Sequence, residues 1–152
     1  MSIEARLAEL GIVLPTPPKP VANYVPVVAS GHLLFVSGQI PLGPSGVEFV
    51  GKLGHDTDID TGRAAALLCA INLLAQVRVH LGDLERVTRC VKLTGFVNAT
   101  LDFADHPKVV NGASDLIVDV LGDKGRHARS AVGVAGLPYG VAVEVEAIFE
   151  FA

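Results

Sequence analysis

The 152-residue chain is short of charged side chains and has no long uninterrupted apolar run. Charged residues make up 18% and hydrophobic residues 50%, whereas an average soluble domain is about a quarter charged. A monomer of this composition has too little polar surface to cover itself, so we expect a homo-oligomer. The longest apolar region, residues 64–81, contains Asn72, Gln76, Arg78 and His80. It therefore falls short of the run of about 18 apolar residues that a membrane span needs.

Cysteines and basic clusters are also scarce. Two cysteines, Cys69 and Cys90, are too few for a disulfide framework, and we expect both to be reduced core residues. The N-terminal MSIEARLAELG has charges among its apolar positions, unlike a signal or transit peptide, so a cytoplasmic location is expected. The net charge is −4 and no Lys/Arg cluster interleaves with aromatic residues, which argues against a nucleic-acid partner.

Two short motifs suggest a nucleotide or metal site, and each lacks a necessary residue. GVEFVGKL, residues 46–53, has the spacing of a phosphate loop, but Leu53 replaces the Ser or Thr that holds magnesium. DTDIDTG, residues 56–62, resembles a calcium loop, but Leu67 stands where a bidentate Glu is needed. The five histidines include no pair at the four-residue helical interval of a zinc site. We therefore predict no metal and no cofactor.

Apolar spacing and turn residues predict one domain over residues 1–152, opening with an extension over residues 1–20. Ser2 as a cap and Gly11 as a stop predict a helix over residues 2–10. LPTPPKP, residues 14–20, contains four prolines and must be extended, as a strap across the domain or a tether to a neighbour. Strands are expected over 24–30, 33–38 and 86–97, with a further short strand near 47–53.

Two longer helices are expected between these strands. The first runs from about residue 58 to 81, begins at Thr57 or Asp58, ends at Gly82 and is apolar around most of its circumference. The second spans residues 107–122 with Pro107 in its first turn. The order of elements predicts an α+β fold, a mixed sheet with the two helices packed on one face. The other face then requires a partner chain.

HARSAVGVAGLPYGVAVEVEAIFEF, residues 127–151, reads as two valine-rich strands that form a closing hairpin. In its second strand the odd positions are apolar, while Glu144, Glu146 and Glu150 occupy the opposite face. A solvated face accounts for these glutamates. Arg129 has only small or apolar neighbours and no local counter-ion. Two interpretations of Arg129 stay open: a pair with Glu146 or Glu150 across the hairpin, or a forked anchor for the carboxylate of an organic acid.

Four separated motifs, in order, resemble the RidA family, also called YjgF/YER057c/UK114. They are VSGQIP (36–41), FVN...LDF (96–103), VVNGA (109–113) and ARSAV...LP...VEVEA (128–147). The resemblance implies a chorismate-mutase-like α+β fold, a homotrimer with a ligand cleft at each subunit interface, and hydrolysis of reactive enamine or imine intermediates to 2-keto acids and ammonia, with no cofactor. The N-terminal extension marks the chain as a member of a divergent subgroup.

Matching the motifs residue by residue implies roles for seven positions. Arg129 takes the carboxylate-binding position and Glu144 the position that orients or activates water. Tyr24 matches an aromatic lining position, Ser37 and Asn111 match polar cleft positions, and Gly38 provides close backbone approach. Ala131 occupies the cleft-wall position at which family members with deaminase activity usually carry Cys.

Two features bear on whether that activity is retained. Ala131 removes a thiol from the implied cleft wall, which favours an alternative: a non-catalytic protein that binds 2-keto acids or other carboxylates. Residues 129 and 144 also differ in strand parity, so a regular hairpin does not aim both side chains into one pocket. A bulge, or a cleft built from two chains, must bring them together. A third function, the endoribonuclease activity with which the family is often labelled, conflicts with the acidic charge balance.

Overall fold

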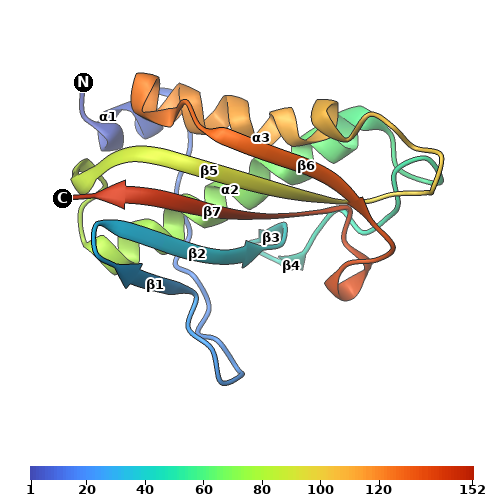
Figure 1. Ribbon diagram of the computed structural model, residues 1–152, viewed down its shortest axis with the longest axis horizontal. Coiled ribbons are helices and arrows are strands. Elements are labelled where there is room, and N and C mark those ends of the chain that lie inside the picture. The colour runs from blue at the N-terminus through green and yellow to red at the C-terminus, as the bar shows by residue number, and fades with distance from the viewer.

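The protein is built on a five-stranded mixed sheet, seen in a computed structural model that describes all 152 residues (Figure 1). The strands are β1 (Val27–Ser30), β2 (Leu33–Gln39), β5 (Val87–Asn98), β6 (Ala128–Val134) and β7 (Val143–Phe151). Their order across the sheet is β1-β2-β7-β5-β6. β5 and β6 pair in parallel and the other neighbours are antiparallel.

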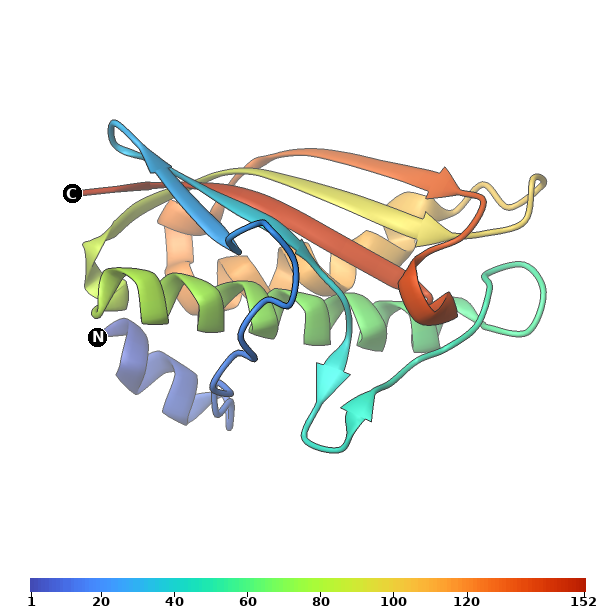
Figure 2. The ribbon, with the colours of Figure 1, turned by 90° about the horizontal axis from the view of Figure 1, so that it is seen from below.

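Three helices cover one face of this sheet, here called the helix face, and leave the other, the open face, uncovered within the chain (Figure 2). α2 (Ile59–Leu81) and α3 (His106–Leu121) lie against the sheet, and α1 (Ile3–Glu9) lies beyond them. The predicted pair of helices on one face is confirmed. α1 is the short N-terminal helix that the sequence predicted, capped by Ser2.

The limits of α2 follow from its terminal residues. The Asp58 side chain accepts a hydrogen bond from the Thr61 amide at the start, and Gly82 ends the helix with a left-handed φ of 79°. By length and composition alone, α2 could cross a membrane. In its most apolar 18-residue stretch, 61% is buried inside the protein. Its buried amide Asn72 donates to the Ile40 and Leu42 carbonyls, so the polar group is satisfied within the core.

The closing segment corrects one sequence prediction, because β6 and β7 do not form a hairpin. β5 lies between them and pairs with both strands (Figure 1). The physical reason is that α3 follows β5 and returns the chain to the end where β5 began, so β6 must run parallel to β5 at the sheet edge. The loop after β6 then carries the chain to the gap between β2 and β5, where β7 runs antiparallel to both.

The expected strand near residues 47–53 is also wrong. A two-residue ladder, β3 (Leu42–Gly43) with β4 (Gly46–Val47), forms outside the main sheet, and beyond it Val50 makes a single bridge to Val141. Short 3-10 turns complete the chain: η1 (Leu84–Arg86), η2 (Gly122–Gly125) and η3 (Pro138–Gly140). Gly or Pro occurs at the β3–β4 turn, in η2 and in η3, and such turn formers favour compact loops over long strands.

The N-terminal extension is fastened to the helices by polar contacts. Arg78 of α2 lies 3.5 Å from the Glu4 carboxylate and donates to the Leu14 carbonyl at 3.1 Å. Leu7 of α1 and Leu14 at the start of the strap are both buried in the core cluster. The segment over residues 14–20 therefore crosses the domain as a strap.

Cys69 and Cys90 are free and fully buried, as the sequence predicted.

The absence of a side chain at Gly112 lets α2 and α3 pack closely together, so a larger residue there should destabilise the fold. A Cβ atom at Gly112 would stand 2.1 Å from the Arg63 carbonyl oxygen. Gly112→Ala must push the helices apart, and we expect it to lower the free energy of unfolding by about 1–3 kcal/mol through overpacking. Urea unfolding followed by circular dichroism, at one protein concentration, measures this. The control is Gly136→Ala, where no heavy atom lies within 4 Å. Equal urea midpoints for the two variants would contradict the prediction.

Candidate functional site

Arg129 lies on the edge strand β6 and reaches toward α3, where both of its protein partners are neutral. Its Nη1 donates to Asn111 Oδ1 at 2.8 Å and to Ser114 Oγ at 3.1 Å. Arg129 forms no ion pair with any carboxylate. The alternative of a pair with Glu146 or Glu150 is therefore wrong, because those residues belong to β7 and β5 separates β7 from β6.

These contacts leave one edge of the guanidinium free. A guanidinium has five N–H donors, and Nη1 carries two of them. Asn111 and Ser114 take those two, so Nε–H and the Nη2 hydrogens have no partner within the chain. The Nε and Nη2 donors point in parallel and match the two oxygens of a carboxylate. The structure thus holds Arg129 by one nitrogen and keeps a fork available for an anion.

Glu144 lies on β7 on the open face and is half-buried over β2. A Cβ atom at Gly38 would stand 2.8 Å from Glu144 Cδ, so the absence of a side chain at Gly38 makes room for this carboxylate. Burial, and secondarily the negative charge of Glu146, raise the pKa of Glu144 above its ordinary value. A carboxyl group with a raised pKa exchanges protons closer to neutral pH than an ordinary glutamate does.

Arg129 and Glu144 lie on opposite faces of the sheet. Arg129 is aligned with Leu93 of β5, which is fully buried on the helix face. Glu144 is aligned with Phe96 of β5, three residues further along and therefore on the other face. No bulge intervenes, because the irregularities in the β5–β7 pairing fall before Lys92. The difference in parity therefore persists, and one chain alone does not bring the two side chains into one pocket.

The remaining expected residues divide between these two places. Asn111 contacts Arg129, and Ala131 is aligned with Gly95 on the helix face, where it packs against the core. Ser37 and Gly38 lie in β2 where its pairing with β7 shifts register. Tyr24 is 57% exposed and lines a shallow hollow beside β1 with Asn23, Val25 and Val28.

Two polar residues near Arg129 were missed by sequence reasoning. Ser114 Oγ lies 2.9 Å from His127 Nε2, and His127 Nδ1 lies 2.6 Å from the Gly125 carbonyl oxygen. Ser114 follows Asn111 by three residues on one helix face, and His127 precedes Arg129 by two residues, with the parity of one strand face. From these spacings the sequence could have indicated that Asn111, Ser114, His127 and Arg129 lie close together.

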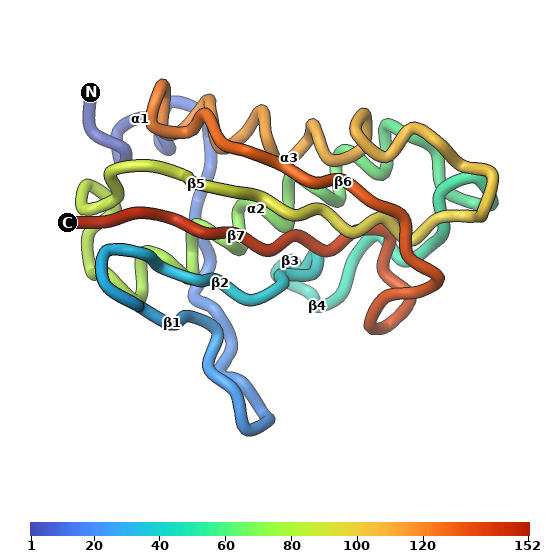
Figure 3. The backbone as a smooth tube through the Cα atoms, in the orientation of Figure 1, coloured from blue at the N-terminus to red at the C-terminus, as the bar shows by residue number.

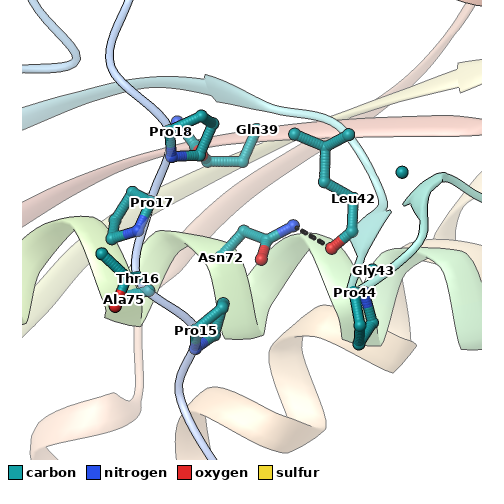
Figure 4. Close-up of a pocket in the computed structure, with 11 residues that line it drawn as sticks. Pro15, Thr16, Pro17, Pro18, Gln39, Leu42, Gly43, Pro44, Asn72 and Ala75 are labelled. Atoms are coloured by element: carbon teal, nitrogen blue, oxygen red, sulfur yellow. Dashed lines mark hydrogen bonds between the residues drawn. The ribbon is translucent and has the colours of Figure 1, made fainter.

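A cavity of about 320 Å³ lies elsewhere, between the proline strap, the β3–β4 ladder and α2 (Figure 4). Pro15, Pro17, Pro18 and Leu42 supply apolar walls, and Asn72 lies in its floor with its amide bonded to the Leu42 carbonyl. None of the seven expected site residues lines this cavity. The tube trace shows the strap passing beneath β2 on its way to β1 (Figure 3).

The protein is a small α+β domain whose sheet has one uncovered face. Arg129, on the edge strand β6, is bonded through Nη1 alone and forms a candidate site for an organic acid. The family described as YjgF/chorismate mutase-like, with endoribonuclease as the activity suggested in that description, matches residues 4–148. The chain therefore belongs to the YjgF/chorismate mutase-like family, which includes the RidA and RutC proteins. This confirms the resemblance found in the sequence and the fold it implied.

Relatives with known names differ in what those names say. Protein TCP17 of Trypanosoma cruzi is 50% identical over 97% of this chain and 93% of its own length. The crystal structure of Atu1372 from Agrobacterium tumefaciens, of unknown function, is 49% identical with a TM-score of 0.93, covering 99% of this chain and 92% of that one. The 2-iminobutanoate/2-iminopropanoate deaminase of Salmonella typhimurium is 32% identical over 86% of this chain and 89% of its length.

The raised pKa of Glu144 predicts a pH dependence of stability. The folded protein binds this proton more tightly than the unfolded chain, so stability falls as pH rises from the ordinary glutamate pKa of 4.5 through the raised pKa of Glu144. Glu144→Gln removes this loss, so the free energy of unfolding of the variant relative to wild type should increase from about pH 4 to about pH 7. Urea unfolding across that range measures it.

A second variant separates the two causes of the shift. Glu146→Gln removes the neighbouring charge but leaves Glu144 buried, so the pH at which stability declines should move part of the way back toward 4.5. A pH-independent difference between Glu144→Gln and wild type would show that the Glu144 carboxyl titrates as an ordinary exposed group.

Proposed function

We propose that the protein hydrolyses reactive 2-imino acids and their enamine tautomers to 2-keto acids and ammonia. The observation that carries the proposal is the Arg129 guanidinium, which is held through Nη1 by Asn111 and Ser114 and offers its Nε and Nη2 donors to a carboxylate. The name of the Salmonella typhimurium relative supports the same chemistry. Arg129 anchors the substrate carboxylate and so places the adjacent C=N carbon.

The reaction needs little from the protein beyond positioning and one proton acceptor. A protonated imine is already electrophilic, and water adds to its carbon while Glu144 accepts a proton from that water. Glu144 then passes this proton to the nitrogen, and as the C–N bond breaks the new hydroxyl gives its own proton to Glu144, so that ammonia leaves and the 2-keto acid remains. The raised pKa of Glu144 suits a group that must both accept and return a proton. No cofactor takes part in this scheme.

The cleft in this proposal lies between protomers, because Arg129 and Glu144 occupy opposite faces of one sheet. The open face carries exposed apolar side chains that a second chain would cover, among them Val28 and Phe35 on neighbouring strands and Val132 on β6. Association through these faces brings the Glu144 side of one chain toward the edge of another. We propose a homotrimer, the assembly that the family resemblance implied.

A non-catalytic carboxylate-binding protein is the second candidate, and Ala131 favours it. Ala131 packs on the helix face beside Arg129 and offers no thiol to the site. Such a protein uses the same Arg129 fork and differs only in lacking turnover. Endoribonuclease activity, although suggested in the family description, is disfavoured by the net charge of −4.

Arg129→Ala is expected to lower kcat/KM at least tenfold, a loss of about 1.4 kcal/mol in transition-state stabilisation. The assay follows ammonia and 2-keto acid release from 2-aminoacrylate generated in situ. Arg129→Lys should recover little of the loss, because an ammonium cannot form two parallel bonds. The control is Arg126→Ala, which removes an exposed arginine bonded only to Asp123 and the neighbouring backbone.

Imine turnover, pyruvate binding and RNA cleavage together distinguish the three candidate functions. Equal rates for wild type and Arg129→Ala would overturn the proposed hydrolysis. Pyruvate binding to wild type by calorimetry, lost in Arg129→Ala and without imine turnover, would instead establish the binding protein. Cleavage of RNA by the purified wild type at low salt would support the endoribonuclease.

Phe35→Glu is expected to dissociate the assembly. Phe35 is 42% exposed in one chain and lies on the open face, so a carboxylate there would be buried against the neighbouring chain without a partner. Light scattering on a sizing column should give the mass of three chains for wild type and one chain for Phe35→Glu. Val79→Glu, at a 64% exposed position on α2, is the matched control and should remain assembled. A monomeric wild type would refute the assembly.

A further inference from the structure

We propose that Ser114 and His127 are positioning residues that fix the guanidinium of Arg129 through a directional hydrogen-bond relay from the Gly125 carbonyl. The inference rests on the proposed function, because it deepens the role of Arg129 as a carboxylate anchor. Four contacts form the relay and its branch: Gly125 O to His127 Nδ1, His127 Nε2 to Ser114 Oγ, Ser114 Oγ to Arg129 Nη1, and Arg129 Nη1 to Asn111 Oδ1.

When the imidazole of His127 is neutral, the direction of every bond follows from the first one. The Gly125 carbonyl oxygen can only accept, so His127 Nδ1, at 2.6 Å, must carry the hydrogen. In the neutral ring Nε2 is then an acceptor, and the Ser114 hydroxyl donates to it across 2.9 Å. The Ser114 hydroxyl hydrogen is thereby committed to His127. The lone pairs of Oγ remain, and one of them accepts from Arg129 Nη1.

This order of donors makes Ser114 an acceptor for Arg129. Without His127, the Ser114 hydroxyl could rotate, and on a helix it can instead donate to a backbone carbonyl of the preceding turn. With His127 in place, Ser114 and Asn111 present two acceptors to the two hydrogens of Nη1. The guanidinium is planar, so fixing Nη1 also fixes the direction of the Nε and Nη2 donors.

The relay starts from a well-supported part of the backbone. Gly125 is buried at the end of η2, and a Cβ atom there would stand 2.6 Å from the Ile117 carbonyl of α3. The chain can therefore lie directly against α3 only because residue 125 is glycine. This contact places His127 beside Ser114, and so α3 holds both ends of the relay.

The consequence for the ligand is preorganisation of a monoanionic site. An arginine loses considerable rotamer freedom when it binds a ligand, and the relay removes that freedom before the ligand arrives. Asn111 and Ser114, the two residues that accept from Arg129, are neutral, so its charge is left for the ligand. The relay should therefore affect ligands that carry a carboxylate and leave neutral analogues of the same shape unaffected.

The test compares pyruvate with its neutral amide, pyruvamide, as probes in calorimetry on the assembled wild type and variants. Ser114→Ala and His127→Leu should each weaken pyruvate binding about threefold to tenfold, the range for loss of one net hydrogen bond. His127→Gln offers an amide oxygen near the place of Nε2 and should restore most of the affinity. His80→Leu, at an exposed histidine on α2, is the control. Any pyruvamide affinity should be the same in all variants.

Kinetics and a double-mutant cycle distinguish positioning from a general loss of structure. The relay variants should raise KM for the imine and leave kcat within about twofold, since Arg129 holds the carboxylate in ground and transition states alike. Ser114→Ala should have no further effect in an Arg129→Ala background, because the relay acts only through Arg129. Additive effects in this cycle would overturn the relay.

The outcomes separate this inference from the proposed function. Wild-type pyruvate affinity retained in Ser114→Ala and His127→Leu, but lost in Arg129→Ala, would overturn the relay and leave Arg129 as the anchor. No pyruvate binding or imine turnover by wild type would overturn the proposed function and with it the role of the relay. Equal losses for pyruvate and pyruvamide would show that the variants disturb the fold, and would also overturn it.

Discussion

The candidate site depends on a guanidinium that the protein holds without neutralising it. Arg129 bonds an amide oxygen and a hydroxyl oxygen through Nη1, and no carboxylate approaches it. Neutral acceptors orient a cation but do not cancel its charge, whereas an internal carboxylate would compete with any acidic ligand. Arg129 is only partly buried, so water can solvate its free edge while no ligand is bound, and the energetic cost of the unpaired charge stays moderate.

The second constraint is that the sheet is covered on one face only. The helix face holds Arg129 with its partners on α3, while the open face holds Glu144 over Gly38. Arg129 is aligned with a β5 residue on the helix face and Glu144 with a β5 residue on the open face, so the two groups lie apart within one chain. In the proposed assembly, a second chain covers the exposed apolar side chains of the open face.

Much of the local structure could be predicted from the sequence because its causes are local. Asp58 and Gly82 mark the ends of α2 through capping and a left-handed φ, which depend on only a few neighbouring residues. The alternation of β7 correctly separated Glu144, Glu146 and Glu150 from the core. The predicted hairpin over residues 127–151 was wrong. Strands that follow one another in sequence are often paired, and no local pattern indicates that β5 pairs with both β6 and β7.

The sequence by itself determined the three α-helices, most of the strands, the two faces of β7 and the family of the chain, since these follow from spacing and short motifs. Only the tertiary structure decided what Arg129 contacts. Asn111, Ser114 and His127 approach it because α3 packs along β6 and the turn at Gly125 lies against that helix. Hydrogen bonds act over about 3 Å, so their partners are chosen by how the elements pack in space.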